Sequence, residues 1–336
     1  MIAGKAFNDC FDVRFQPVLG ASNKTKTLFE GVFNQHTALS WPQKNEFEEL
    51  YNNHINLVNC FDDVTLPVLK PSKGLNDTWD ACKKLGAYLY SSTIGQSCFK
   101  GIRRVGTSMN DHFKAFRESN GKVCCFCGCE NYMAERKISE EYGNEGEDQW
   151  RASYDHYLAK KHYPFSSVDF DNLIPCCQTC NEKAKGEINL LEREGKRHRV
   201  FRPFYDAIPN GLTAKVETID GFNITWTVDK LFLGLKILHK TYNWDNTFQV
   251  TARATEIFND HANTSYFSYV LLGTDDATNA RDALEKAKKI ASSSVQNERE
   301  AYFKALCFEA LINESDEVLE PLRKAVNEQF SHRVVF

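Results

Sequence analysis

The sequence contains two short cysteine clusters, Cys124-Cys125-Phe126-Cys127-Gly128-Cys129 and Cys176-Cys177-Gln178-Thr179-Cys180. Each cluster holds one Cys-x-x-Cys spacing, Cys124 with Cys127 and Cys177 with Cys180. Two residues between thiolates allow a tight turn to direct both sulfurs to one centre, and two such turns complete a tetrahedral site. Gly128 suits the first turn because glycine tolerates positive φ. We therefore expect these four thiolates to hold one Zn²⁺ ion.

Two other interpretations of the cysteines are a set of unrelated reduced thiols and a redox dithiol. A second matching pair argues against both. Cys125, Cys129 and Cys176 are spare, and one of them could replace an assigned ligand. Four protein thiolates leave no open position for water, so the expected zinc is structural and not catalytic.

Length and composition limit the function classes. The chain has 336 residues, enough for two or three domains, and a formal net charge of -4. A wholly basic surface is therefore excluded, and any nucleic-acid contact must come from a local patch. We find no apolar stretch long enough to cross a bilayer and no signal peptide, so the expected location is the cytoplasm, without membrane contact.

The chain is expected to have an α+β fold in three regions. Residues 1–121 are predicted to be mainly helical, because Phe47, Leu50, Tyr51, His54 and Val58 recur at helical spacing. Residues 122–206 contain both cysteine clusters. Residues 207–336 are predicted to form a hairpin that turns at Asp220-Gly221, followed by helices, because apolar residues alternate on both sides of the turn.

Further polar motifs lie between and beside the two cysteine clusters. The segment 152–160 alternates as a strand does and contains Asp155-His156. Asn172 opens the run Asn172-Leu173-Ile174-Pro175, which leads into the second cluster, and Asn181 follows that cluster directly.

From Cys124 to Gly186 the chain resembles the zinc-containing HNH endonuclease family, through C-x-x-C, D-H, N-L-I-P and C-x-x-C-N in that order. The resemblance covers a small part of the chain, but the four motifs are specific in combination. It implies a ββα-metal fold, in which a two-stranded hairpin and one helix surround a single divalent ion, Mg²⁺ or Mn²⁺. The flanks would be the helical N-terminal region and an α+β C-terminal region.

The resemblance assigns roles to four residues. His156 matches the first letter of the signature and would be the general base. Asn172 matches the second and would brace the loop that faces the histidine. Asn181 matches the third and, with Asp155, would bind the catalytic ion. Chemistry agrees, since imidazole with a pKa of ~6.5 accepts a proton near neutrality, and carboxylate and amide oxygens are ligands for magnesium.

Two features depart from a simple pattern. Asp155 and His156 occupy adjacent strand positions and would point to opposite faces, so we expect a local irregularity there. Ala159 stands where many relatives have proline, and the lysine that often follows the last asparagine by three residues is displaced. Lys183 and Lys185 flank that position, and Lys185 is the better candidate because it lies one helical turn after Asn181.

The candidates for phosphate contact are Lys183, Lys185, Arg197 and Arg199, in a basic stretch that ends at Arg202. The alternative is a solvated helix face, because glutamates interleave with these residues. No segment resembles a helix that reads base edges. We therefore expect double-stranded DNA to be bound without strong sequence specificity.

The favoured hypothesis is a metal-dependent DNA endonuclease. The alternatives are a catalytically silent zinc-stapled module that binds nucleic acid or protein, and an RNA-directed nuclease. HNH modules of this sort often occur in anti-phage defence, sometimes beside an ATPase. This chain has no Walker-type loop, so a regulatory ATPase would be a partner. One module cuts one strand, so double-strand breaks would need a homo-oligomer or repeated nicks.

Overall fold

A computed structural model of the chain describes residues 5–92, 109–132, 153–206 and 211–330. Two compact units make up the chain. The first unit comprises 1–116, 154–174 and 186–205, and the second comprises 117–153, 175–185 and 206–336. The segment 122–206, expected from the sequence to be one module, is thus divided between the units. Among the described residues, no helix has both the length and the apolar character to cross a membrane.

Helices make up most of the first unit. They are α1 (Gln16–Ala21), α2 (Asn23–Ala38), α3 (Trp41–Ile55) and α4 (Asn76–Ser92), and α6 (Met109–Asn120) begins in this unit and ends in the second. A capping box of Ser40 and Gln43 starts α3, satisfying backbone N–H groups that the first turn leaves unpaired.

The predicted apolar stripe on α3 is partly correct. Phe47, Leu50 and His54 are buried on one face, and the first two pack with Leu75 and Trp79 in a core cluster. Tyr51 and Val58 are 43% and 44% exposed. Val58 lies beyond the end of α3, in a short 3-10 turn, so the helical spacing no longer applies to it.

Short strands and turns complete the first unit. Strand β1 (Ser153–His156) pairs with β2 (Leu173–Cys176), and both strands run across a boundary between the units. Between them lie the 3-10 turns η7 (Pro164–Ser166) and η8 (Phe170–Asn172). Further on, β3 (Glu192–Arg193) and β4 (Lys196–Arg197) form a small hairpin. Its turn residues, Glu194 and Gly195, both have positive φ. The basic stretch is therefore not the helix face considered above.

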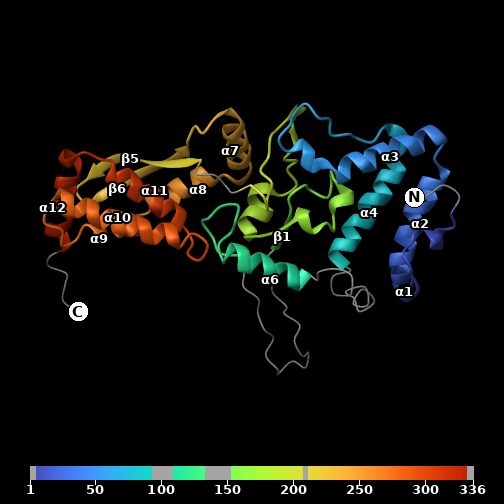
Figure 1. The fold of residues 1–336 in the computed structure, drawn as a ribbon, viewed down its shortest axis with the longest axis horizontal. Coiled ribbons are helices and arrows are strands. Elements are labelled where there is room, and N and C mark those ends of the chain that lie inside the picture. Colours follow the sequence, from blue (N-terminus) through green and yellow to red (C-terminus); the bar gives the residue numbers. More distant parts are fainter. Residues whose placement is uncertain (1–4, 93–108, 133–152, 207–210, 331–336) are drawn as a thin grey trace, which may run out of the picture. The chain divides into compact units, whose positions relative to one another are not determined.

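The second unit is built on a hairpin covered by helices (Figure 1). Strands β5 (Leu212–Asp220) and β6 (Asn223–Lys230) pair antiparallel around Asp220 and Gly221, so the predicted hairpin is confirmed. The helices that follow are α7 (Leu235–Phe248), α8 (Val250–Asn259), α9 (His261–Val270), α10 (Ala277–Ser293), α11 (Ala301–Ile312) and α12 (Asp316–Phe330). Helix α8 packs on β6, and α11 packs on β5.

An aromatic core joins these helices to the hairpin. Trp226 of β6 contacts Phe267 of α9 with ring centroids 4.8 Å apart, and Phe267 also contacts Phe258 and Phe308. All four rings are buried. Burying a large aromatic side chain contributes roughly 1.5–3 kcal/mol, so this cluster anchors the second unit. The α+β class expected from the sequence describes the chain as a whole.

Candidate metal centre and catalytic strand

The second unit brings the four predicted cysteine ligands together. Cys124 and Cys127 lie in a knuckle, residues 122–132, closed by a bridge between Val123 and Asn131. Gly128 turns this knuckle with a φ of 66° and donates its backbone N–H to the carbonyl of Cys124. Cys177 follows β2, and Cys180 lies in η9 (Thr179–Lys185), a π-type helix. Two separated turns therefore meet at one point.

The geometry of the four sulfurs fits one metal ion. Their Sγ atoms all lie within 4.8 Å of one another, and Cys127 Sγ is 3.8 Å from Cys177 Sγ. A Zn–S distance of about 2.3 Å implies sulfur separations of about 3.8 Å in a regular tetrahedron. None of the four residues is more than 3% exposed. The cluster is therefore both compact enough and dry enough to hold a metal ion.

The surroundings of the sulfurs also fit a cation. The backbone N–H of Cys177 donates to Cys124 Sγ at 3.3 Å, and that of Cys180 donates to Cys177 Sγ at 3.4 Å. Burial raises the pKa of the Cys124 thiol well above its ordinary range, so a thiolate there requires a compensating positive charge. A divalent ion would supply it, and four thiolates would leave no position open to water.

The three spare cysteines lie outside this group of four. Cys129 Sγ is directed to the carbonyl of Cys127 at 3.2 Å, and Cys125 Sγ lies 3.8 Å from the carbonyl of Pro175. Cys176 is buried within β2. Among the described residues, the group that could hold a metal ion consists of the two assigned pairs.

In the first unit, His156 ends strand β1 with a defined ring orientation. Its Nε2 lies 2.9 Å from the carbonyl oxygen of Ser167. A carbonyl only accepts, so Nε2 carries the hydrogen, and in a neutral ring Nδ1 then carries the lone pair. Tyr90 of α4 packs edge to face on the imidazole with centroids 4.2 Å apart. The ring is thus fixed on two sides, with Nδ1 as its basic atom.

Asp155 and His156 are both buried, at 1% and 8% exposure. On a strand, successive side chains point to opposite faces. Protein therefore covers both faces of this short strand, which ends at His156.

Asn172 connects three segments around the histidine. Its side-chain Nδ2 donates to the carbonyls of Leu158 and Ser166 at 3.0 Å each, and its Oδ1 accepts from the N–H of Leu158 at 2.6 Å. Its own carbonyl accepts from the N–H of Tyr157. The buried amide therefore ties the chain after β1 to the turn that carries Ser167, the partner of His156.

Helix α4 holds that turn from another side. Gly86 lies so close to it that an added Cβ would be 2.5 Å from Ser167 Oγ and 2.9 Å from the carbonyl of Pro164. Ser167 Oγ itself donates to that carbonyl at 2.7 Å. Only glycine permits this approach without a shift of the turn.

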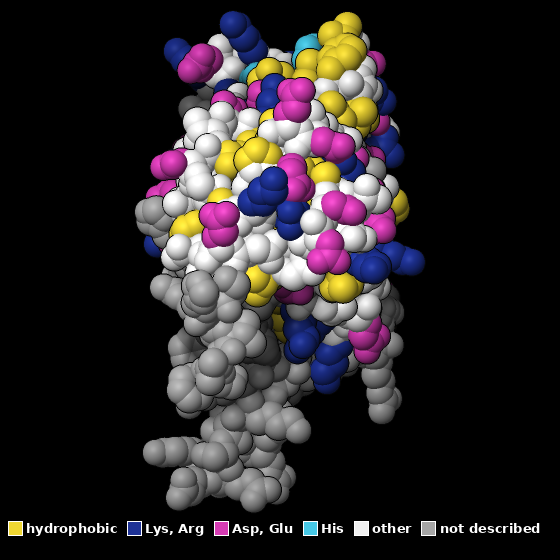
Figure 2. Space-filling view, turned by 90° about the vertical axis from the view of Figure 1, so that its left-hand side faces the viewer, with side chains coloured by type: hydrophobic (Ala, Val, Ile, Leu, Met, Phe, Trp, Pro, Cys, Tyr) yellow, Lys and Arg dark blue, Asp and Glu magenta, His cyan; other side chains and the backbone are white. Residues whose placement is uncertain are grey.

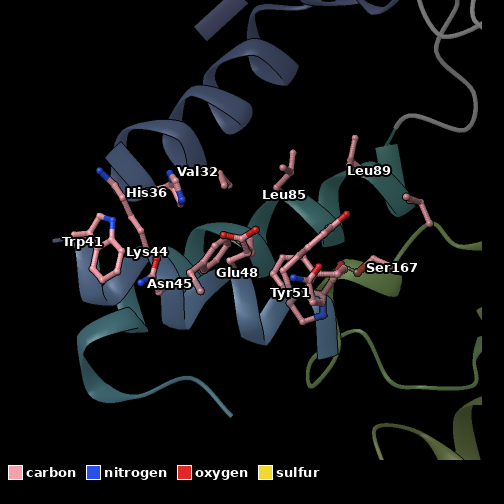
Figure 3. Close-up of a pocket in the computed structure, with 17 residues that line it drawn as sticks. Val32, His36, Trp41, Lys44, Asn45, Glu48, Tyr51, Leu85, Leu89 and Ser167 are labelled. Atoms are coloured by element: carbon pink, nitrogen blue, oxygen red, sulfur yellow. Dashed lines mark hydrogen bonds between the residues drawn. The ribbon is translucent and has the colours of Figure 1, made fainter. Parts of the chain in front are cut away.

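A pocket of about 810 Å³ lies on the first unit (Figure 3). Helices α2, α3 and α4 and the segment 164–168 line it. His36, Trp41 and Lys44 stand at one end in the close-up, and Tyr51 and Ser167 at the other. Because Ser167 belongs to its wall, the pocket borders the turn that orients His156.

The predicted site residues fall into two groups. Asp155, His156 and Asn172 belong to the first unit, where they lie around one strand end. Asn181, the other proposed ligand of a catalytic ion, belongs to the second unit. It is half-buried in η9, and its N–H donates to the carbonyl of Cys177.

The predicted phosphate contacts differ in accessibility. Lys183 is exposed, whereas Lys185 is only 2% exposed, so the preference for Lys185 is wrong on the ground of burial. The guanidinium of Arg197 donates to the carbonyl of Cys60, and that of Arg199 donates to the carbonyl of Asp62. These two arginines therefore hold the loop at residues 60–62.

Charge on the face shown in Figure 2 is evenly mixed. Lys and Arg side chains alternate with Asp and Glu over its described residues, and no broad basic field appears among them. Non-specific DNA binding relies on clustered positive charge. This face therefore offers no support for a DNA-binding surface.

Four residues around the candidate sites carry no motif in the sequence. Tyr90 and Ser167 orient His156, and Arg253 and Glu130 lie beside the cysteines. Tyr90 and Arg253 come from helices far away in sequence. Neither spacing nor residue type marks any of the four, so only the folded chain reveals them.

Comparison of the chain with protein-family models, curated proteins and solved structures finds no match. The ordered motifs and the geometry of the two candidate sites are therefore the features that bear on function.

Proposed function

We propose that this protein is a metal-dependent endonuclease of the HNH kind that hydrolyses phosphodiester bonds in DNA. His156 is the general base, and Asp155 with Asn181 supplies oxygen ligands for Mg²⁺ or Mn²⁺. The observation that carries the proposal is the bond from His156 Nε2 to the Ser167 carbonyl. It assigns the lone pair to Nδ1, and a general base needs a fixed basic atom.

The proposed chemistry of His156 is proton removal from water. Nδ1 accepts a proton of a water molecule while the water oxygen bonds to the phosphorus and the bond from phosphorus to the leaving oxygen breaks, and the leaving oxygen takes a proton from solvent. The imidazolium forms with its Nε2–H still bonded to the Ser167 carbonyl. That bond becomes charge-assisted when the ring is protonated, so it favours the step. Tyr90 and the amide of Asn172 act as positioning groups, because they fix the ring and the turn that binds it.

The proposed catalytic ion is assigned on donor chemistry alone. A carboxylate from Asp155 and an amide oxygen from Asn181 are hard ligands of the kind that magnesium prefers. Such an ion, when bound, stabilises negative charge on the phosphate and on the leaving oxygen.

The four-cysteine centre is proposed to hold a structural zinc ion. A closed thiolate site supplies folding free energy and no vacant coordination position. Cys177 and Cys180 follow β2 directly, and Asn181 is the next residue, so the ion would fix the chain beside the asparagine. Metal analysis of the purified protein should find one zinc per chain.

A plasmid nicking assay tests the nuclease proposal. We expect wild-type protein to nick supercoiled DNA with Mg²⁺ and to be inactive with EDTA. His156→Ala should lower the rate by about 10²–10⁴-fold, the usual contribution of a general base. His239→Ala, a change at an exposed histidine on α7, should leave the rate unchanged. Equal cleavage by wild type and His156→Ala would refute the mechanism.

The same assay decides between the substrate classes. Wild-type protein that is inactive on DNA but cleaves RNA in a His156-dependent manner would reassign the substrate. Protein that contains zinc but cleaves neither nucleic acid would be a silent zinc-stapled module.

A further inference from the structure

Arg253 of α8 reaches the cysteine centre from the C-terminal region of the chain. Its Nη1 lies 3.4 Å from Cys180 Sγ, and its Nη2 lies 3.7 Å from Cys127 Sγ. One guanidinium thus contacts one sulfur from each Cys-x-x-Cys pair. Its side chain is 18% exposed, so these contacts are largely shielded from water.

The charge of a loaded centre explains why an arginine should stand there. Four thiolates and one divalent cation carry a net charge of about −2, and a buried charge of this size needs compensation. A guanidinium suits this role because it stays protonated and presents several N–H donors in a fixed plane. Thiols accept hydrogen bonds only weakly, whereas thiolates carry full charge, so the two N–H···S contacts favour the ionised form.

Glu130 fixes the direction of the guanidinium. Its Oε1 accepts from Arg253 Nη2 at 2.6 Å, and its Oε2 accepts from Thr179 Oγ1 at 3.1 Å. Glu130 belongs to the first knuckle and Thr179 to the second cysteine turn. The carboxylate therefore joins both cysteine-bearing turns to the arginine.

The start of α8 is rigidly placed, which makes the contact specific. Asp245 accepts from the N–H and the hydroxyl of Thr251 at 2.8 and 2.7 Å, closing the corner between α7 and α8. At this corner Phe248 stacks on Phe126 of the knuckle, with centroids 4.5 Å apart. The helix corner and the knuckle thus pack as one body within the second unit.

Another C-terminal segment holds the knuckle as well. The carbonyl of Gln296 accepts from the N–H of Lys122 at 2.7 Å, and the N–H of Glu300 donates to the carbonyl of Gly128 at 2.7 Å. The segment between α10 and α11 therefore also contacts the knuckle, while Arg253 of α8 contacts the sulfurs themselves.

We propose that Arg253, aligned by Glu130, is a positioning residue of the metal centre, and that through it metal binding fastens helix α8 to the two cysteine turns. This rests on the proposed metal centre and is independent of nuclease activity. A zinc ion at this centre would then connect the two cysteine turns to each other and also, through Arg253, to helix α8.

The test is metal affinity, measured by competition with a chromophoric zinc chelator. Groups that orient metal ligands typically contribute 10–100-fold in affinity, so we expect Arg253→Met to weaken zinc binding by about that factor. Arg253→Lys should have an intermediate zinc affinity, because lysine keeps the positive charge but lacks the planar set of N–H donors of the guanidinium. Arg281→Met, which removes an arginine that pairs with Asp316 in the same unit, should keep wild-type affinity.

A second readout separates this role from general stability. With Co²⁺ in place of zinc, the thiolate-to-cobalt absorption of Arg253→Met should shift, and hydrogen exchange in α8 should no longer respond to metal removal. If Arg253→Met does not fold, Glu130→Gln supplies the test, with a smaller loss of affinity. Wild-type affinity and cobalt spectrum in the Arg253 or Glu130 variant would overturn the proposal. Wild-type protein that binds no metal would instead overturn the metal centre.

Discussion

The cysteine centre and the His156 strand are built in opposite ways. The cysteine centre depends on two local turns with Cys-x-x-Cys spacing, and its four Sγ atoms lie within 4.8 Å of one another. The histidine depends on neighbours from distant segments, namely the Ser167 carbonyl, the Tyr90 ring and the Asn172 amide that ties the turn. Loss of one cysteine should therefore disrupt the cysteine centre, whereas loss of a residue that positions the imidazole should disrupt the histidine site.

The two regions also differ in what they contribute, since one would stabilise the fold and the other would carry out the reaction. A closed thiolate site can stabilise the fold but offers no reactive position. At the histidine, the basic Nδ1 is the reactive atom of the proposed mechanism, and the bond from Nε2 to the Ser167 carbonyl sets its orientation. Mutations in the two regions should therefore produce different losses, namely of metal and folded structure at the cysteine centre and of activity at the histidine.

The largest effect is expected at the cysteine centre. Replacing Cys177 and Cys180 by serine should abolish metal binding and unfold the second unit, since structural zinc contributes on the order of 10–16 kcal/mol in small zinc domains. Metal analysis and circular dichroism provide the readouts. Cys125→Ser, at a half-buried cysteine outside the group of four, should keep the metal. A folded double variant would mean that the turns need no metal.

A smaller effect is expected from Asn172, which hydrogen-bonds the turn that carries Ser167. Asn172→Ala removes three side-chain hydrogen bonds and leaves the buried N–H of Leu158 without that partner. We expect a loss of about 2–4 kcal/mol in the free energy of unfolding, because each unsatisfied buried group costs about 1–3 kcal/mol. Urea unfolding measures it, with exposed Asn56→Ala as the control.

The zinc content of Asn172→Ala shows whether the two regions depend on each other. Asn172→Ala should keep its zinc while it loses nicking activity, because the cysteines belong to the other compact unit. Loss of zinc from this variant would show that the two regions are not independent.

Acid should weaken the first unit through its buried and half-buried histidines. Burial lowers the pKa of His54 below 6.5, although its bond to the Leu69 carbonyl raises it, and burial also lowers the pKa of His112 and His162. As pH falls below 6.5 the unfolded histidines take up protons before the folded ones do, so stability falls through that window. The decrease is at most about 1.4 kcal/mol per pH unit for a buried histidine such as His54.

Urea unfolding of the first unit at pH 7.5 and pH 5.5 measures this effect. His54→Gln can keep a donor for the Leu69 carbonyl without titrating, and should reduce the pH dependence. His239→Gln, on the second unit, should not change it. A pH dependence that is unaltered in His54→Gln would assign the effect to other groups.

The sequence predicted the elements that depend on short spacings. The Cys-x-x-Cys pairs and the hairpin at Asp220-Gly221 are set by turn chemistry within a few residues, and both are present. It did not predict that Lys185 is buried, or that Arg197 and Arg199 bind the carbonyls of Cys60 and Asp62. Those outcomes depend on contacts between segments far apart in the chain, and charge alone does not reveal which side chains remain at the surface.

The division of the segment 122–206 between two compact units has the same cause. The knuckle packs against Phe248 and Arg253 from the C-terminal helices, whereas the chain after β1 packs with α4 near Gly86. A motif marks which residues share a reaction but carries no information on which helices cover them. Motif and spacing therefore do not predict the residues that orient His156 or those that contact the sulfurs.

The smallest expected effect concerns DNA affinity and decides which region contacts phosphate. Lys183 is exposed after the second cysteine turn, so Lys183→Ala should reduce the slope of log affinity against log salt by about 0.9, the value for one lost phosphate contact. Arg199→Ala should leave the slope unchanged and lower stability instead, because its guanidinium holds the carbonyl of Asp62. Binding isotherms of a DNA duplex at several salt concentrations measure the slopes. A reduced slope for Arg199→Ala with an unchanged slope for Lys183→Ala would contradict this prediction. The phosphate contact would then lie near the loop at residues 60–62 and not beside the cysteine centre.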